Sequence, residues 1–449
     1  MHPFPVQTES LVVPPVSIHQ RAVAAYDGMT RGVGRPDWIR LREREDVLVD
    51  AKHVDERIQS GEHPPLAGAT VATAETGEHV SRLVQAGAIV LGYVDAAGAD
   101  RLAQDPMLGA LDAVWTPGWP QRCGTHVVFR PTAGLVPGRS GSQVIARDVA
   151  MAQRTAAALA GPGSAGAGAR TWPEGVRFGA GEHPRIAVPD LDRAEHPAFA
   201  ATVDTLRATG ASVSAIDLPA SLRRWTRRGA RPLDGVDAVV TPMSGLEPTA
   251  ATLVGTLDVA ATAVADRGVA ELAVLTAAFD DQIALDVVAQ LTGVAADEPF
   301  PDTGVELVVF GAYLRGQPLN DRLISIGARF AGVAETAPHY RMVVLPGRPA
   351  QPGVVRTAAG GGLLVGERWI VSEAGLGRFL AGLAEPMALG GIDLAEGRTA
   401  TGLLCDPVAA SAGRDITDYR CWRAYLRQLS TRTVRRPTAN GPIRRPGCG

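Results

Sequence analysis

Lysine is almost absent from this sequence. Of the 44 lysine and arginine residues, only Lys52 is a lysine. Arginine carries all the other positive charge, and a guanidinium group keeps its proton in proteins. Any mechanism that needs an amine as a base therefore has one candidate in the chain.

The sequence also has few cysteines, no long apolar run and little net charge. Cys123, Cys405, Cys421 and Cys448 show no CxxC spacing, so we expect neither a disulfide framework nor a metal site. No run approaches the roughly 20 apolar residues of a membrane span, and the start of the chain lacks the features of a signal peptide. We therefore expect a cytoplasmic protein with no membrane contact and no cofactor. The net charge of -3 gives no indication of nucleic-acid binding.

The first two thirds of the chain alternate short apolar runs with amphipathic segments. The run 88–92, AIVLG, lies between glycines and is typical of a buried strand, and the helix predicted over 78–87 ends in glycine. This alternation predicts an α/β layer fold with a mostly parallel sheet. Further strands are expected near 185–188, 212–217 and 238–240, and helices near 14–27, 36–57, 146–160, 194–208, 256–266 and 280–292.

A different, β-rich pattern follows Pro299 and Pro301. It predicts a smaller α+β domain with a curled sheet, with strands near 306–310, 340–345, 363–371 and 399–405 and one helix near 319–334. We expect a first domain over 1–293, a linker over 294–303, a second domain over 304–430 and a disordered basic tail over 431–449.

The stretch 306–320, ELVVFGAYLRGQPLN, contains the feature that most suggests a site. Its β-branched run breaks at Gly311, and a glycine at the end of a strand lets the backbone turn sharply. The following amides and side chains would then point into a hollow. An ordinary bend between a strand and a loop is the alternative.

Motifs in this part of the chain carry a family resemblance. They are GAYL at 311–314, TAPHYRM at 336–342, a glycine hairpin at 360–362, GLLC at 402–405 and WRAYL at 422–426. In this order and spacing, residues 304–427 resemble the C-terminal domain of allophanate hydrolases, the amidase-signature enzymes that complete urea breakdown. Less specific motifs resemble the amidase scaffold, at 65–68, 83–92, 130–134 and 238–242. The resemblance implies a truncated amidase-like first domain.

The resemblance also implies that the amidase machinery is lost. Amidases of this family use a serine, a second serine and a lysine, and the lysine position here holds Ala74, followed by Glu75. The loop that carries both serines is missing. Ser140 and Ser142 do not replace it, because we expect no base beside them. Four scattered histidines are expected to be surface or packing residues: His63, His79, His126 and His183.

In the second domain, the family's histidine of the Gly-Ala-His-Leu motif is replaced by Tyr313, a poor proton shuttle. What remains resembles the frame of a small anion pocket. Tyr313 and Glu367 are the candidate catalytic residues, although a solvated surface role for Glu367 is the alternative. His339, beside a proline, is expected to be exposed. The candidate substrate-binding residues are Gly311, Ala312, Leu314, Asn320, Tyr340 and Arg341.

Two hypotheses of function follow. The chain is an enzyme acting on a small carboxylate or amide, such as allophanate or a carbamate, through its C-terminal pocket. Alternatively, it is a non-catalytic paralogue that binds a metabolite or serves as a partner subunit of an active amidase, and urea carboxylase is a further candidate partner. A homodimer is expected only by analogy with the family. Nucleic-acid binding through the arginine-rich tail is the weakest interpretation.

Overall fold

The computed structural model describes residues 17–31, 39–95, 99–138, 141–161, 169–227, 233–266, 270–294, 299–346 and 350–434. The chain forms two compact units. The first contains Met1–Pro173 and Glu182–Asp302, and the second contains Glu174–Gly181 and Thr303–Gly449. The domain predicted over 1–293 includes the segment 174–181, which packs with the second unit.

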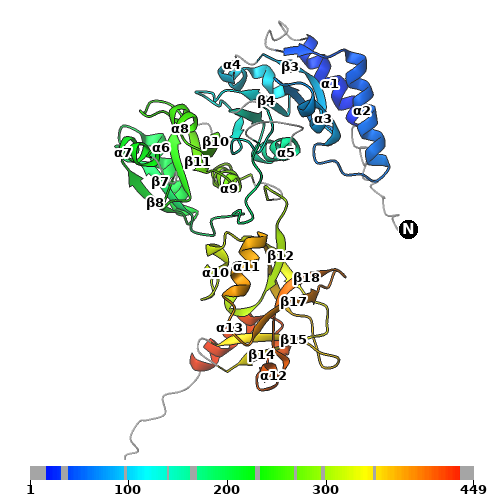
Figure 1. The fold of residues 1–449 in the computed structure, drawn as a ribbon, viewed down its shortest axis with the longest axis vertical. Coiled ribbons are helices and arrows are strands. Elements are labelled where there is room, and N and C mark those ends of the chain that lie inside the picture. Colours follow the sequence, from blue (N-terminus) through cyan, green and yellow to red (C-terminus); the bar gives the residue numbers. More distant parts are fainter. Residues whose placement is uncertain are drawn as a thin grey trace, which may run out of the picture. The chain divides into compact units, whose positions relative to one another are not determined.

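An eleven-stranded sheet forms the centre of the first unit (Figure 1), in the order β1-β3-β2-β4-β6-β5-β10-β11-β9-β7-β8. Its strands are β1 (Ile39–Leu41), β2 (Thr70–Thr73), β3 (Ile89–Val94), β4 (Ala113–Pro117), β5 (Val127–Arg130), β6 (Ser142–Ala146), β7 (Arg185–Pro189), β8 (Ser212–Ile216), β9 (Ala238–Pro242), β10 (Val259–Asp266) and β11 (Ala270–Ala277).

The α/β layer architecture predicted from the sequence is confirmed, with a sheet that mixes parallel and antiparallel strands. Parallel pairs occur toward both ends of this sheet, where β2 lies between β3 and β4, and β7 lies between β8 and β9. The central strands pair antiparallel, from β4 through β6, β5, β10 and β11 to β9. Short connections such as the one between β10 and β11 allow only antiparallel neighbours, whereas helical crossovers connect the parallel strands.

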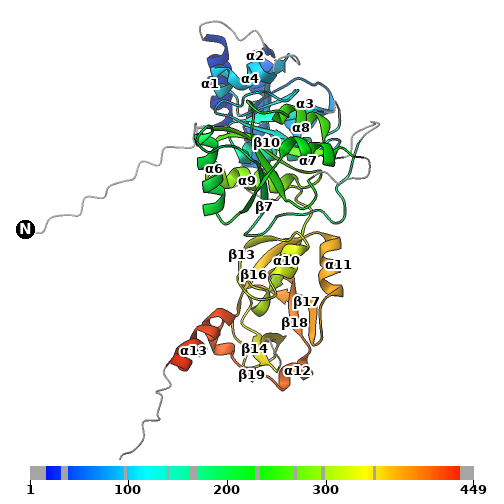
Figure 2. The same ribbon diagram turned by 90° about the vertical axis from the view of Figure 1, so that its left-hand side faces the viewer.

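Helices cover both faces of this sheet (Figures 1 and 2). Neighbouring residues on one strand, such as Val90 and Leu91, belong to opposite cores because side chains alternate across a strand. One core contains residues of α3 (Glu78–Gln85), α5 (Val149–Leu159), α6 (Pro197–Ala208) and α9 (Asp281–Thr292). The other contains residues of α1 (Ile18–Arg31), α2 (Arg44–Gln59), α4 (Ala99–Gln104), α7 (Leu218–Trp225) and α8 (Ala250–Thr256).

The second unit contains a five-stranded and a three-stranded sheet around one main core. The larger has the order β13-β16-β12-β18-β17 and the smaller the order β15-β14-β19. The strands are β12 (Val305–Val309), β13 (Arg329–Glu335), β14 (Tyr340–Leu345), β15 (Gln351–Arg356), β16 (Val365–Val371), β17 (Met387–Asp393), β18 (Thr399–Cys405) and β19 (Arg414–Asp415). The helices are α10 (Asp321–Ser325), α11 (Glu373–Ala381), α12 (Pro407–Ser411) and α13 (Trp422–Val434).

The segment 174–181 is tied to the second unit by backbone hydrogen bonds. The Phe178 amide donates to the Gly327 carbonyl at 2.8 Å, and the Ala374 amide donates to the Glu174 carbonyl at 3.1 Å. The Phe178 side chain is fully buried. A piece of chain between two elements of the first unit therefore packs as part of the second.

The helix predicted over 256–266 is wrong, because Val259–Asp266 forms β10. The run VAATAVAD is rich in alanine, the strongest helix former. Here β10 is paired on both sides, with β5 and β11, and Ala260, Ala261 and Ala263 are buried. Tertiary pairing on both edges therefore overrides the local preference for helix.

The helix predicted over 319–334 is also largely wrong. Helix α10 ends at Ser325, and the chain turns at Gly327, whose φ is +75°, before it enters β13. At the other end of the unit, α13 continues to Val434, so residues 431–434 of the predicted disordered tail are helical. The rest of that tail, and 295–298 of the predicted linker, lie outside the described residues.

Candidate functional site

The turn after β12 is shaped by Gly311. Its φ is +67°, and a Cβ atom at this position would lie 2.1 Å from Pro352 Cγ. Only glycine satisfies both conditions. The turn continues as a short 3-10 helix, Gly311–Tyr313, and Ala312, Tyr313 and Leu314 are all buried. The residues predicted to open a hollow are thus packed inside the second unit.

Glu367 lies directly beside this turn. It is the cross-strand partner of Val309 on β12, and only 2% of the residue is exposed. The alternative of a solvated surface residue is therefore wrong. Its Oε2 accepts a hydrogen bond from the Arg315 amide at 2.9 Å, and its Oε1 accepts one from Arg423 Nη2 at 2.8 Å. The amide expected to cradle a substrate carboxylate instead holds a carboxylate of the protein itself.

Tyr313 turns its ring into the core. The ring packs edge-on against Phe379, with 5.3 Å between centroids. Burial raises the pKa of the Tyr313 hydroxyl from its ordinary value, and the nearby Arg322 guanidinium opposes this only partly. The hydroxyl therefore keeps its proton at neutral pH and can act as a hydrogen-bond donor.

Asn320 contacts the same turn. Its Nδ2 donates to the Tyr313 carbonyl at 3.0 Å, and 7% of the residue is exposed. The structure thus brings together Gly311, Ala312, Tyr313, Leu314, Asn320 and Glu367. Asn320 Nδ2 and both carboxylate oxygens of Glu367 are thus bonded to other groups of the second unit.

Tyr340 and Arg341 lie elsewhere, on β14 of the smaller sheet. As neighbours on one strand they point to opposite faces. The Tyr340 side chain is fully buried, whereas Arg341 pairs with Asp415 at the surface, with 2.7 Å between Nη2 and Oδ2. The structure therefore separates these two predicted binding residues from Glu367 and from each other.

A second polar group surrounds the Tyr340 hydroxyl. Asp393 donates its backbone amide to this hydroxyl at 2.8 Å, and Arg356 Nη2 donates to it at 3.2 Å. The Asp393 carboxylate also lies 3.0 Å from His339 Nε2. Sequence reasoning missed Asp393 and Arg356, because they are distant in sequence from His339 and belong to no motif. The only feature of the sequence that pointed to this polar group was the position of His339 just before the predicted strand 340–345.

In the first unit the structure places the two residues that bear on the expected loss of the amidase lysine. Ala74 follows β2, and Lys52 is exposed on α2. Glu75, however, lies beside Ser142, whose Oγ donates to Oε1 at 3.2 Å. The expectation that Ser142 has no base beside it is therefore wrong, because strand pairing through β4 brings β6 close to the end of β2.

The other carboxylate oxygen of Glu75 lies 3.2 Å from His79 Nδ1. His79 Nε2 lies 2.6 Å from the Pro137 carbonyl oxygen, and the ring stacks on Trp115. Only 6% of His79 is exposed, in agreement with the expected packing role. Because Glu75 lies between Ser142 and the ring, the histidine does not contact the hydroxyl and the order differs from that of a Ser-His-acid triad.

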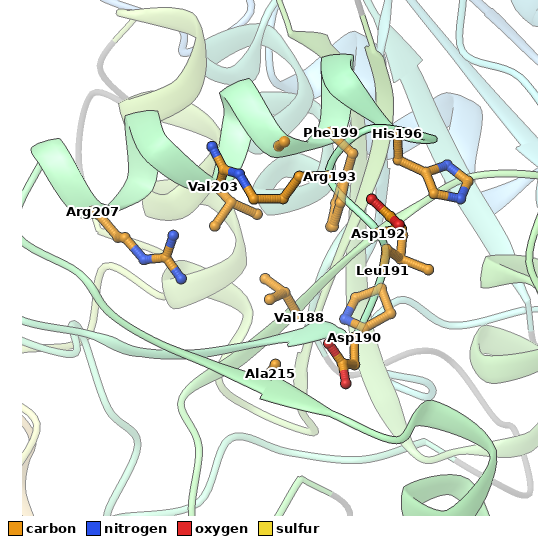
Figure 3. A pocket seen from close by; sticks show the side chains of 12 residues that line it. Val188, Asp190, Leu191, Asp192, Arg193, His196, Phe199, Val203, Arg207 and Ala215 are labelled. Carbon is orange, nitrogen blue, oxygen red and sulfur yellow. The ribbon is translucent and has the colours of Figure 1, made fainter.

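A pocket of about 190 Å³ lies in the first unit, at the carboxyl end of β7 and beside α6 (Figure 3). Val188, Phe199 and Val203 contribute an apolar wall. Arg193 on its rim forms an ion pair with Asp204, at 2.6 Å. None of the predicted site residues lines this pocket.

Clusters that could hold a metal ion and helices that could cross a bilayer are both absent from the described residues. No group of three or more His, Cys, Asp or Glu side chains is placed there to hold a metal ion. No helix in the same part of the chain has the length and apolar character needed to cross a bilayer. Burial raises the pKa of the Cys123 thiol to about 12 and that of Cys405 to about 11, so neither is a thiolate at neutral pH.

Comparisons with known proteins show which family the second unit is similar to. Residues 305–427 match the family model described as the allophanate hydrolase C-terminal domain. The urea amidolyase of Saccharomyces cerevisiae is 30% identical over 134 residues, which is 29% of this chain and 7% of that protein. The second unit is thus similar to the allophanate hydrolase C-terminal domain.

The likeness of fold extends over nearly all of the chain. The Kluyveromyces lactis allophanate hydrolase structure matches with a TM-score of 0.65 at 17% identity, covering 92% of this chain and 97% of that one. The K. lactis urea amidolyase structure gives 0.67 and 17%, covering 92% of this chain and 36% of that one. At this identity the match establishes the fold alone. The aligned part spans only 7% of the length of each curated relative, so these relatives are far longer than this chain.

Proposed function

We propose that this chain acts on a small carboxylated C–N compound of the allophanate or carbamate type, and that the chemistry takes place in its second unit. The observation that carries the proposal is a contrast between the units. In the first, the position of the amidase lysine holds Ala74 and the sole lysine is on the surface. In the second, the family's C-terminal domain is present from 305 to 427.

The proposal assigns the donor role to Tyr313. Its hydroxyl keeps its proton at neutral pH because of burial, so it can stabilise negative charge that develops on a carbonyl or carboxylate oxygen. Glu367 is proposed as the neighbouring acid or base. It reaches a substrate only if Arg315 and Arg423 release its carboxylate, since both contact it in the structure.

The test is turnover by the purified full chain. We expect release of carbon dioxide or ammonia from allophanate faster than the uncatalysed background. Tyr313→Phe should slow release about tenfold or more, in line with the loss of one catalytic donor. Tyr26→Phe is the matched control, because that hydroxyl donates to the Arg42 carbonyl in the first unit. Absence of turnover by the unaltered chain would contradict the proposal.

A non-catalytic role is the second candidate, and a specific observation favours it. Both oxygens of Glu367 are engaged by protein groups, as expected for a buried carboxylate with a structural function. In this case the chain would bind a small carboxylate, or would serve as a subunit beside an active amidase or a urea carboxylase. Calorimetric binding of allophanate without turnover, or co-purification with such an enzyme, would support this role.

A further inference from the structure

The pocket beside α6 in the first unit has an apolar interior (Figure 3). Val188 on β7 lines it from the sheet, and Phe199 and Val203 line it from α6. These three residues are 4%, 6% and 6% exposed. The volume of about 190 Å³ corresponds to roughly six water molecules at about 30 Å³ each. The pocket is therefore large enough for a small metabolite and too small for a lipid chain or a nucleotide.

One side of the pocket is open because it lies at the edge of the sheet. Strand β8 is the last strand in the sheet order, and its Ala215 lines the pocket and is exposed. The side chain of alanine is a single methyl group, so it leaves the space between β8 and α6 unfilled. A small molecule can therefore enter from solvent without any movement of the core.

Positive charge is in excess on the α6 side of the pocket. Arg193 Nη2 lies 2.6 Å from Asp204 Oδ2, whereas Arg207 Nη1 lies 3.5 Å from Asp204 Oδ1. Two guanidinium groups thus share one carboxylate. Within the described residues this long contact is the only polar contact of the Arg207 side chain, which is 50% exposed. Because residues four apart share a helix face, Arg207 extends the face that carries Phe199 and Val203, and its remaining N–H donors can bind an anion at the pocket.

A carboxylate without a partner lies at another border of the pocket. Asp190 follows β7 directly, and its amide donates to the Ile216 carbonyl at 3.0 Å. Its carboxylate has no hydrogen bond or ion pair with any described residue, whereas the carboxylate of Asp192 accepts a hydrogen bond from a backbone amide at 2.8 Å. Arg207 and Asp190 lie on different sides of the hollow, with Val188 between them (Figure 3). The carboxyl ends of parallel strands, where Asp190 lies, are the usual position of ligands in α/β sheets.

We propose that this pocket binds a small aliphatic α-amino acid. The aliphatic side chain packs against Val188 and Val203, the carboxylate accepts hydrogen bonds from Arg207, and the ammonium group donates to Asp190. A carboxylate ligand without the ammonium group would place like charge beside Asp190, and an amine without the carboxylate would leave Arg207 unpaired. The inference does not depend on the proposed function, because none of the residues assigned to that function lines this pocket.

The simpler alternative is a water-filled depression at the edge of a sheet. In that case Arg207 and Asp190 are ordinary solvated charges, and the pocket does not discriminate between small molecules. The two interpretations therefore differ in selectivity between ligands that have the same shape and different charge.

Isothermal titration calorimetry of the full chain with L-valine is the test. We expect a Kd below about 1 mM, from two charge-assisted contacts and one apolar contact. Isovalerate is valine without its ammonium group and isobutylamine is valine without its carboxylate, so each should bind at least about tenfold more weakly. Glycine, which has no side chain to bury, should also bind at least about tenfold more weakly. Undetectable binding of L-valine, or equal binding of L-valine and isovalerate, overturns the inference.

Substitutions connect the affinity to the charged groups of the pocket. Arg207→Gln and Asp190→Asn should each weaken L-valine binding about tenfold, and Asp190→Asn should also reduce the preference for L-valine over isovalerate. Arg224→Gln and Glu195→Gln are the matched controls, because both residues are exposed and neither lines the pocket. They should leave the Kd unchanged. Unchanged affinity in either Arg207→Gln or Asp190→Asn overturns the inference.

Ala215→Leu fills the pocket from the exposed edge strand. It should abolish L-valine binding while thermal unfolding stays close to that of the unaltered chain, because substitutions at exposed positions have small effects on stability. Full binding of L-valine by Ala215→Leu would place the ligand elsewhere and overturn the inference. Arg207→Gln should act on allophanate at the rate of the unaltered chain, so failure of this site and failure of the proposed function are observed separately.

Discussion

The backbone amide of Arg315 donates a 2.9 Å hydrogen bond to the carboxylate of Glu367. The two residues are 52 positions apart in sequence, and Arg423 contacts the same carboxylate. A turn that follows a strand is thus closed by a buried acid from the neighbouring strand. An anion entering this turn would have to displace Glu367.

Glu367→Gln should therefore destabilise the second unit. Hydrogen bonds to a charged group contribute about 1.5–3 kcal/mol, and we expect the free energy of unfolding to fall by a similar amount. Glu396→Gln is the matched control, because that side chain is 55% exposed in its ion pair with Arg398 and should cost less than about 1 kcal/mol. Urea denaturation measures both, and equal effects would contradict a structural role for Glu367.

Gly311→Ala should be strongly destabilising for a different reason. The added Cβ would overlap Pro352 and would also require a φ of +67°, which together should cost about 3 kcal/mol or more. Gly316→Ala isolates the backbone contribution, because Gly316 has a φ of +70° but no atom within 4 Å of its Cβ position. The denaturant midpoints of the two variants measure the contribution of the overlap with Pro352 to the loss of stability. Similar midpoints would show that Pro352 shifts to accommodate the added Cβ and would contradict the prediction.

Asp281 should make stability depend on pH. It is fully buried and accepts hydrogen bonds from the amide and hydroxyl of Thr132, and burial raises its pKa from 3.8 to about 7. Between these pH values the folded state holds a proton that the unfolded state has lost. The stabilising contribution of Asp281 is thus fully present below about pH 4 and is lost as pH rises through 7.

Asp281→Asn tests this directly, because the amide does not titrate. We expect the stability of Asp281→Asn relative to the unaltered chain to increase as pH rises from 4 to 7 and then to level off. Asp204→Asn is the control, because the hydrogen bond from Arg193 lowers the pKa of Asp204 from its ordinary value, and its stability relative to the unaltered chain should stay level from pH 4 to 7. Thermal unfolding over this pH range provides the measurement, and parallel curves for Asp281→Asn and the unaltered chain would refute the assignment.

Lys52→Met should leave both activity and stability unchanged. Lys52 is exposed on α2, and substitutions at such positions usually change stability by less than about 0.5 kcal/mol. The measurement is ammonia release from allophanate by the variant and the unaltered chain under the same conditions. Loss of activity would mean that the lone lysine works as an amidase base, against its position in the fold.

Local sequence was enough to locate many elements. The predicted strands 340–345 and 399–405 have the bounds of β14 and β18, because each is a short run of β-branched or apolar residues with clear ends. Prediction from local sequence was wrong at β10, because its alanines favour a helix. Pairing with β5 and β11 makes this segment a strand. Pairing between distant segments leaves no mark in the local pattern.

For the site, the sequence by itself determined which side chains are available: a single lysine, Ala74, Tyr313 and an acid at 367. The tertiary structure alone decided which of them meet. It joined Glu367 to the Gly311 turn, and it brought Asp393 and Arg356 to His339. The physical reason is that hydrogen bonds and ion pairs depend on distances of about 3 Å in space, and strand register, not sequence spacing, sets those distances.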